Sequence, residues 1–462
     1  MRNRFAYGAF ALLLGFLGVA LQPGRGQEFH VKTHQLTNGM RILLLEDHAI
    51  PNIALDFVHR VGSRNERPGI TGLSHFFEHM RFNGAKKYGP GMFDRVMEDN
   101  GGANNAYTSE DITVYQDWFP TPALPLIFDL EADRMRDLDF DPTKVESERG
   151  VIENERRLTV DNNNESLLDE QLMAAAFTAH PYSWPVVGWM TDIKHWKRED
   201  LIQYYRTHYA PNNCVMVVVG DFSEETVLKL AREHFESIPV QAQPAPVTTE
   251  EPEQLGERRV VVNKFAQMPL IEVGYHGPAA LNEDYIPMKV LNYILLRGES
   301  SRLYRRLVDE EQVATSISGG HSAHLDPFPF KLTIQPRSEV PPDRIEEVLY
   351  EELEQVRMNL VSEVELRKAK NTAVADFYRS MKTISGKADL LGTYEVIFGD
   401  YRELFKTVDR INAVTREDVR RVAIKYFGPK NRTVAILVPE DEDQTSEAEQ
   451  SPEAHDKTPS KR

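Results

Sequence analysis

The sequence predicts an α+β protein of two homologous domains, each a mostly antiparallel sheet flanked by helices. Three observations support this fold class. Residues 198–219 recur as residues 416–437, at a constant offset of 218 residues. The strand-like stretches 40–45 and 53–58 follow one another before any long helical pattern, which is typical of a largely antiparallel sheet with helices on one face. A Pro- and Glu-rich stretch without apolar periodicity separates the two copies.

The repeat has the same local pattern in both copies. Each copy predicts a helix, a Pro-Asn turn and a buried strand, with Pro211 matching Pro429 and Asn213 matching Asn431. The strand beginning at Ile53 also resembles the one beginning at Leu270. A repeat of this length indicates duplicated domains, because solenoid periods are much shorter.

The N-terminus has the composition of a targeting segment. Residues 1–4 are basic, residues 5–21 are apolar, and Pro23 ends the run. We therefore expect a signal peptide and a periplasmic protein, with no stable membrane span after cleavage. An uncleaved anchor is the alternative, because seventeen apolar residues are near the lower limit for crossing a bilayer. The predicted organisation is a signal peptide (1–26), an N-terminal domain (27–240), an exposed linker (241–258), a C-terminal domain (259–439) and a disordered acidic tail (440–462).

Composition excludes some functions. The chain has 462 residues, of which 41% are hydrophobic and 27% charged, as in soluble globular proteins. Its formal net charge of −17 argues against nucleic acid as a partner, since such proteins carry a basic surface. Cys214 is the only cysteine, so neither an intrachain disulfide nor a thiolate metal cluster can form. Its buried-strand surroundings indicate a core residue.

A zinc-type motif lies in residues 72–82. His75 and His79 are four residues apart in a segment of helical character, so both side chains lie on one helical face, one turn apart. Glu78 borders this face and can act as a general base toward water activated by a metal. The order His-x-x-Glu-His is the inverted zincin pattern. By itself it is only suggestive, because an exposed helical histidine pair has the same spacing.

A catalytic zinc site needs three protein ligands and one open position. Glu148 and Glu155 are candidates for the third ligand. They are seven residues apart, so they share a helical face but stand two turns, about 10.5 Å, from each other. One can bind the ion and the other can only support it, and the spacing does not choose between them. Glu146 and Glu153 point elsewhere and are expected to be solvated.

Together these motifs resemble the pitrilysin and mitochondrial processing peptidase family of inverted zincin peptidases, closest to its short bacterial branch. The resemblance covers residues 32–437 and is carried by residues 72–80, 105–115 and 148–155. It implies a clamshell half built of two domains. It also implies one Zn²⁺ per chain, and it assigns the roles as follows: ligands His75, His79 and Glu155, base Glu78, and supporting carboxylate Glu148.

The resemblance also implies a substrate-binding strand. Asn105, Ala106 and Tyr107 are expected on an edge strand to which a peptide substrate adds as a further strand. An ordinary sheet edge is the alternative interpretation of this segment.

One part of the family pattern is missing from residues 300–317. They align with a family segment in which an arginine and, seven residues later, a tyrosine hold the substrate and the developing oxyanion. Val308 and Thr315 stand at these two places. Valine donates no hydrogen bond, and a threonine hydroxyl is too short to replace a phenol. Loss of an oxyanion donor typically lowers turnover by about 10²–10³. The resemblance therefore implies a heterodimer in which a homologous partner, without the zinc motif, supplies both residues.

The predicted function is a zinc metalloendopeptidase subunit that hydrolyses peptides or unfolded segments. A non-catalytic assembly subunit is one alternative, although four intact site residues argue against it. A peptide-binding clamp is another. His321 and His324 are three residues apart in a loop-like segment and have no acidic partner in a metal-binding spacing, so we do not expect a second metal there. Residues 184–196, rich in aromatic side chains, are expected to pack around a loop.

Overall fold

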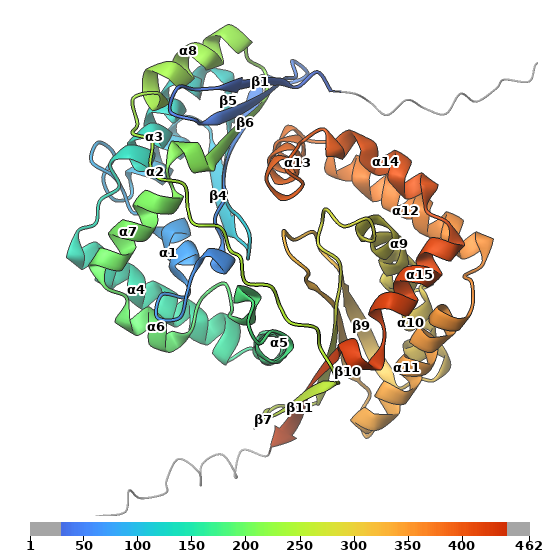
Figure 1. Ribbon diagram of the computed structural model, residues 1–462. Helices are drawn as coiled ribbons and strands as arrows, with labels where there is room; N and C mark the ends of the chain where they lie inside the picture. Colours follow the sequence, from blue (N-terminus) through green and yellow to red (C-terminus); the bar gives the residue numbers. More distant parts are fainter. Residues whose placement is uncertain (1–28, 441–462) are drawn as a thin grey trace, which may run out of the picture.

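The computed structural model describes residues 29–440 and contains two sheets, one in each half of the chain. The predicted signal peptide and nearly all of the predicted tail lie outside the described residues. Figure 1 shows the two halves facing each other like the shells of a clam, with the helices mostly on the outside. This arrangement confirms the predicted α+β fold of two domains.

The first sheet has six strands in the order β1-β2-β6-β3-β5-β4. Only β2 and β6 are parallel neighbours, and all the other neighbours are antiparallel. The strand β4 is therefore an edge strand that pairs with β5 alone. The strands are β1 (Lys32–Gln35), β2 (Arg41–Glu46), β3 (Asn52–His59), β4 (Ala103–Thr108), β5 (Thr113–Pro120) and β6 (Cys214–Gly220).

The second sheet repeats this topology without the first strand. Its order is β7-β11-β8-β10-β9, and again a single neighbouring pair, β7 and β11, is parallel. The strands predicted from the repeat, β6 and β11, occupy equivalent places beside the centre of each sheet. The strands are β7 (Arg258–Phe265), β8 (Leu270–His276), β9 (Ala314–Gly320), β10 (Pro329–Pro336) and β11 (Arg432–Glu440).

Helices flank both sheets, and most of them lie on the outer faces (Figure 1). In the first domain they are α1 (Leu73–Met80), α2 (Met92–Asp99), α3 (Leu124–Arg136), α4 (Pro142–Arg156), α5 (Asn164–Ala176), α6 (Met190–His195), α7 (Arg198–His208) and α8 (Glu224–Phe235). In the second domain they are α9 (Tyr285–Leu296), α10 (Arg302–Tyr304), α11 (Pro342–Met358), α12 (Glu363–Ser380), α13 (Ile384–Ile397), α14 (Glu403–Ala413) and α15 (Arg416–Tyr426). Two π-helical segments, η3 (Arg157–Asp161) and η6 (Arg305–Glu310), follow α4 and α10.

The prediction that helices cover only one face of each sheet was incomplete. The inner face of the first sheet carries α13 from the second domain, and the inner face of the second sheet carries α5 from the first (Figure 1). The reason is that the central strands are apolar on both faces. Along β6, Met216 and Val218 enter the core of the first domain, whereas Val215, Val217 and Val219 pack against α13.

This exchange of helices joins the two domains into one hydrophobic unit. Gly392 lets α13 approach the sheet closely, because a Cβ there would lie 2.5 Å from Val58 Cγ2. Leu168 and Leu172 of α5 pack on Leu270 and Leu437 in the same way.

Most residues of the segment 241–258 are exposed, but it is anchored at several points, among them Gln254, which donates to Arg432 O at 2.7 Å, and Glu251. Glu251 accepts backbone hydrogen bonds from Thr178, Ala179 and His180 at 2.9–3.1 Å. These contacts hold the linker against the first domain.

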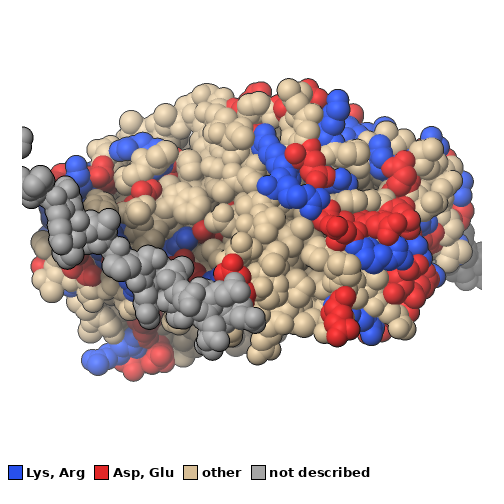
Figure 2. All heavy atoms as spheres, turned by 90° about the horizontal axis from the view of Figure 1, so that it is seen from below, with Lys and Arg blue, Asp and Glu red and all other residues tan. Residues whose placement is uncertain are grey.

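Charged side chains of both signs lie next to one another on the surface seen in Figure 2, and they gather over the second domain. Ion pairs such as Arg344–Glu347 at 2.6 Å on α11 account for part of this intermixing. Of the described helices, none has the length and apolar character needed to span a bilayer.

Candidate metal centre

The helix α1, which carries the His-x-x-Glu-His motif, begins at a turn that only glycine fits. Gly72 has a φ of 88°, and a Cβ at this position would lie 2.4 Å from Val187 O. The buried Glu66 satisfies the start of the helix, because its carboxyl oxygens accept the N–H groups of Gly72 and Ser74, both at 2.7 Å. Burial raises the pKa of Glu66 to about 8, and the two backbone hydrogen bonds oppose this rise.

The remaining turns of α1 are fixed by packing and by tyrosine hydroxyls. Phe76 and Phe77 are buried in the core of the first domain, which leaves His75 and His79 on the opposite, accessible face. Tyr115 donates a hydrogen bond to Phe77 O at 2.7 Å. The histidine rings are therefore carried on a rigid backbone, with their ring centroids 4.7 Å apart.

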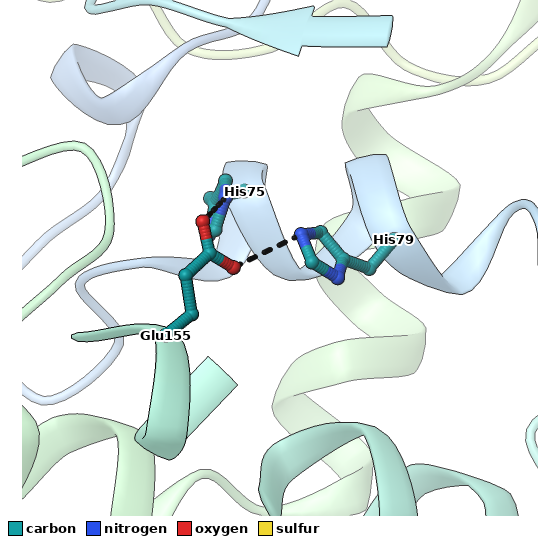
Figure 3. A group of neighbouring side chains, drawn as sticks. All are labelled: His75, His79 and Glu155. Carbon is teal, nitrogen blue, oxygen red and sulfur yellow. Dashed lines mark ion pairs between the residues drawn. The ribbon is translucent and has the colours of Figure 1, made fainter. Parts of the chain in front are cut away.

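The helix α4 brings the two predicted carboxylates to α1. Its first turn is capped by Asp141, and its length places Glu148 and Glu155 two turns apart, as the sequence predicted. Glu155 reaches both histidines, with distances of 3.6 Å to His75 Nε2 and 3.3 Å to His79 Nε2 (Figure 3). Glu148 instead contacts the far side of the His79 ring, at 2.8 Å from Nδ1. The tertiary structure thus separates two glutamates that the spacing left equivalent.

The donor set of His75, His79 and Glu155 fits a zinc ion. One ligand atom from each residue can be chosen so that all three lie within 4.8 Å of one another. Tetrahedral zinc with bonds near 2.0 Å holds its donors about 3.3 Å apart, so closing around an ion requires only small side-chain movements. Burial lowers the pKa of His75 to about 4, so this ring is neutral, the form that binds metal.

The position of Glu148 matches that of a carboxylate that orients a metal-binding histidine. Its contact with Nδ1 leaves Nε2 of His79 directed at Glu155 (Figure 3). Glu148 also accepts a hydrogen bond from the side chain of Asn83. Burial alone would lower the pKa of His79, but the hydrogen bonds to Glu148 and Glu155 outweigh burial and raise it to about 9.

Glu78 lies between the histidines and the edge strand β4. Burial raises the pKa of Glu78, and a hydrogen bond with Thr108 of β4 opposes this rise. A groove of about 380 Å³ runs along this place, and it is lined by Glu78, His79, Phe82, Asn83, Asp94, Asn104, Asn105, Ala106 and Glu148. Two predicted features, the motif and the strand containing Asn105 and Ala106, therefore face the same groove.

Sequence comparison agrees with this geometry. Residues 41–188 match the sequence model of the family described as Insulinase (Peptidase family M16), and residues 195–373 match the one described as Peptidase M16 inactive domain. The chain belongs to the M16 peptidase family. The first match contains the whole donor set, and the second covers most of the second domain.

Individual M16 relatives are similar along nearly the whole chain. The zinc protease PqqE of Helicobacter pylori is 29% identical over 94% of this chain and 98% of its own length. The beta subunit of a mitochondrial-processing peptidase from Lentinula edodes is 26% identical, over 81% of this chain and 83% of its own. The crystal structure of a protease from Helicobacter pylori is 28% identical and superimposes with a TM-score of 0.86, over 89% of this chain and 100% of that one.

The two positions that differ from the family pattern lie in the second domain. Val308 is buried in its core, and the hydroxyl of Thr315 donates to Gln335 O in the neighbouring strand. The nearby arginines are already paired with carboxylates: Arg302 with Glu352 and Glu365, Arg305 with Glu310, and Arg306 with Glu311 and Glu351.

His321 and His324 lie in the loop after β9 and do not face each other across an ion. His321 bonds to Pro278 O at 2.8 Å, whereas His324 stacks on Phe328 and contacts Asp111 at 3.0 Å. The acidic residue in contact with His324 is thus Asp111 of the first domain.

Three residues around the centre were not identified from the sequence. Asn83 could have been identified from its spacing, since it follows His79 by four residues; in the structure it bonds to Glu148. Glu66 lies in a loop, and no local pattern marks it as the residue that caps α1. Asp389 comes from the other domain, where it bonds to Tyr107 of β4.

Proposed function

We propose that this chain is the zinc-bearing subunit of an M16 endopeptidase that cleaves peptides or unfolded protein segments. The convergence of His75, His79 and Glu155, with Glu148 behind His79, is the observation that carries the proposal. An assembly subunit would not require three donors within 4.8 Å and a fourth carboxylate that fixes the orientation of one of them. The names of the relatives, zinc proteases and a processing-peptidase subunit, point the same way.

Each residue of the centre has a defined task in this proposal. Zinc held by the three donors would supply a Lewis acid that polarises a carbonyl oxygen and makes water more acidic. Glu78 accepts the proton of the attacking water and returns it to the departing amine nitrogen. Burial raises the pKa of Glu78 above its ordinary value, which makes its carboxylate a stronger proton acceptor.

The edge strand β4 gives the peptide a binding mode. Its outer side faces no other strand of the sheet, so an extended peptide can hydrogen-bond to the backbone of residues 103–108. This places the substrate backbone along the groove that contains Glu78 and His79.

The cavity between the domains favours positively charged substrates. It has a volume of about 780 Å³ and begins one turn beyond Glu155, at Thr159. Of the carboxylates that line this cavity, Asp169 pairs with Lys331 and Glu170 pairs with Arg156, and burial raises the pKa of Glu272 to about 9. Glu110 and Glu165 therefore give the cavity its negative charge. Segments rich in Lys and Arg are therefore the preferred substrate class.

The proposal includes a homologous partner that supplies an arginine and a tyrosine. Val308 is buried and Thr315 is bonded within its own sheet, so neither can replace these groups. We expect the kcat of this chain alone to be about 10²–10³-fold lower than that of the chain with its partner. A partner would be a homologous chain that lacks His-x-x-Glu-His.

The deciding experiment combines metal analysis with cleavage of a quenched-fluorescence basic peptide. Wild type and Glu78→Gln are measured alone and with the partner. We expect one zinc per chain in both proteins, with cleavage by the wild type only. Zinc without cleavage, even with the partner, would favour a peptide-binding clamp, and absence of zinc would favour an assembly role. Full activity of the wild type alone would exclude the need for a partner.

We also propose export to the periplasm, on the composition of residues 1–26. Fusion of these residues to alkaline phosphatase, which is active only after export, tests this. A fusion without phosphatase activity would contradict it.

A further inference from the structure

The hairpin that carries the substrate strand is tied to the second domain at two points. The first tie joins Tyr107 of β4 to Asp389 of α13, with the Tyr107 hydroxyl donating to Oδ1 at 2.8 Å. Tyr107 packs against the apolar cluster between the first sheet and α13. Its neighbour Ala106 packs instead against the core of the first domain. The side chain of Tyr107 is therefore directed at the second domain.

The second tie lies at the tip of the hairpin. Asp111, between β4 and β5, is 2% exposed, and its Oδ2 accepts a hydrogen bond from Leu325 N at 3.1 Å. The same oxygen contacts Nδ1 of His324 at 3.0 Å, and Oδ1 accepts from Tyr182 at 2.7 Å. The other ring nitrogen of His324, Nε2, lies 2.9 Å from Ser322 Oγ, so both nitrogens of this ring have hydrogen-bond partners.

These ties matter because β4 lies at the edge of its sheet, where no further strand fixes its outer side. Its only partner strand is β5, and from the first domain it also contacts α1 and α2, where Thr108 bonds to Glu78 and Asn104 donates to Asp94 at 3.2 Å. A peptide that adds to β4 takes its position from this strand. A displacement of about 1 Å between the scissile carbonyl and the catalytic groups can lower a rate about 100-fold.

We propose that Asp389 and His324 of the second domain are positioning residues, which fix the substrate strand β4 relative to the metal centre through Tyr107 and Asp111. The inference rests on the proposed peptidase function and extends it. It gives the second domain, which carries no donor set among its described residues, a direct part in the cleavage of substrate. Neither residue touches the substrate or the metal.

The test compares two substitutions on the same helix. Asp389→Ala removes the tie to β4, whereas Lys387→Ala removes the ion pair with Asp47, which also joins the domains but lies away from β4. Asp389→Asn keeps an acceptor for Tyr107 and serves as the conservative variant. Zinc content, kcat and KM for a basic peptide are measured with the partner present.

We expect Asp389→Ala to lower kcat/KM about 10-fold or more, with zinc content unchanged. Asp389→Asn should recover most of this loss, and Lys387→Ala should stay within twofold of wild type. The double variant Tyr107→Phe/Asp389→Ala should be no worse than Asp389→Ala, because both changes break one contact. His324→Ala should act in the same direction. Equal kcat/KM in Asp389→Ala and Lys387→Ala would overturn the inference.

Hydrogen exchange separates this inference from the proposed function. The amides of residues 103–108 should exchange faster in Asp389→Ala and His324→Ala than in Lys387→Ala. This measurement needs no cleavage, so it remains decisive if the wild type hydrolyses no peptide. Identical exchange of β4 in all variants would show that the second domain does not hold this strand.

Discussion

The two domains share one sheet topology, and each has a buried acidic residue before its equivalent helix. The two acidic residues differ in their hydrogen-bond partners and in the direction of their pKa shifts. In the first domain, Glu66 accepts hydrogen bonds from backbone N–H groups at the start of α1 and forms no ion pair among the described residues. In the second, Asp284 lies 218 residues further on, before α9, and bonds to Arg421, to Lys425 at 2.6 Å and to Tyr426 at 2.9 Å. Burial alone would raise the pKa of Asp284, but these bonds lower it, whereas the pKa of Glu66 is raised.

The two domains also differ at the positions of the candidate metal centre. At the offset of 218 residues, His75, Glu78 and His79 correspond to Tyr293, Leu296 and Arg297. Duplication therefore preserved the sheet and its helices, because these depend on apolar positions shared by many sequences. The candidate metal donor set depends on a few side chains and, among the described residues, it lies in the first domain, so the two copies can be altered in parallel.

The largest contrast between the domains is expected for zinc binding. His79→Ala removes one of three donors, so the dissociation constant for zinc should rise more than about 100-fold and cleavage should be lost. Arg297→Ala, at the equivalent place in the second domain, should leave zinc binding unchanged. Titration with a competing chelator measures both. A similar loss in the two variants would mean that the effect comes from general destabilisation.

A smaller effect on zinc affinity is expected for Glu148, which contacts His79 on the side away from the donor set. Glu148→Gln removes the charge that orients His79, and zinc affinity should fall about 10–100-fold. Glu146→Gln on the same helix is the control, because its side chain is 66% exposed and pairs only with Arg149. The contribution of Glu148 would be refuted by equal zinc affinities of the two variants at equal thermal stability.

The contact between the domains can be tested with two glycines in helices. Alanine in place of glycine favours a helix by about 0.5–1 kcal/mol. Gly150→Ala on α4 has open space around its new Cβ, so it should raise the free energy of unfolding by about that amount. Gly392→Ala brings a Cβ to 2.5 Å from Val58 Cγ2, so it should lower stability by about 1–3 kcal/mol. Denaturant unfolding measures both changes in the free energy of unfolding. A stability change of the same sign in both variants would contradict the close packing of α13 against the sheet.

The remaining predictions concern the two buried acids, whose effects on stability change with pH in opposite directions. Because the pKa of Glu66 is raised to about 8, the folded chain holds a proton there that the unfolded chain releases above about 4.5. Stability should therefore fall as pH rises from 4.5 to 8, with a slope of up to about 1.4 kcal/mol per pH unit from this residue. Glu66→Gln should remove this slope, and the exposed Glu299→Gln should not.

Asp284 should behave in the opposite way. Its lowered pKa contributes stability above the ordinary value of 3.8, and this contribution is lost as pH falls through the folded pKa. Asp284→Asn should therefore destabilise the protein at neutral pH and have little effect in acid. Melting temperatures of Glu66→Gln, Asp284→Asn and the wild type are measured across pH 3–9. If both variants change the melting temperature with the same pH dependence, the opposite pKa shifts of the two acids are refuted.

The sequence by itself determined the duplicated α+β fold and the helix with His75, Glu78 and His79, because apolar periodicity and i, i+4 spacing are local properties. It could also narrow the third ligand to Glu148 or Glu155. Only the tertiary structure decided between them geometrically, since the approach of α4 to α1 places Glu155 before the histidines and Glu148 behind one ring.

Tertiary structure also decided what covers the inner faces of the sheets and what holds β4. The exchange of α5 and α13, the cap from Glu66 and the tie between Tyr107 and Asp389 join residues that are far apart in the chain or lie in loops. No periodic pattern reports such contacts, because they depend on where whole elements come to rest.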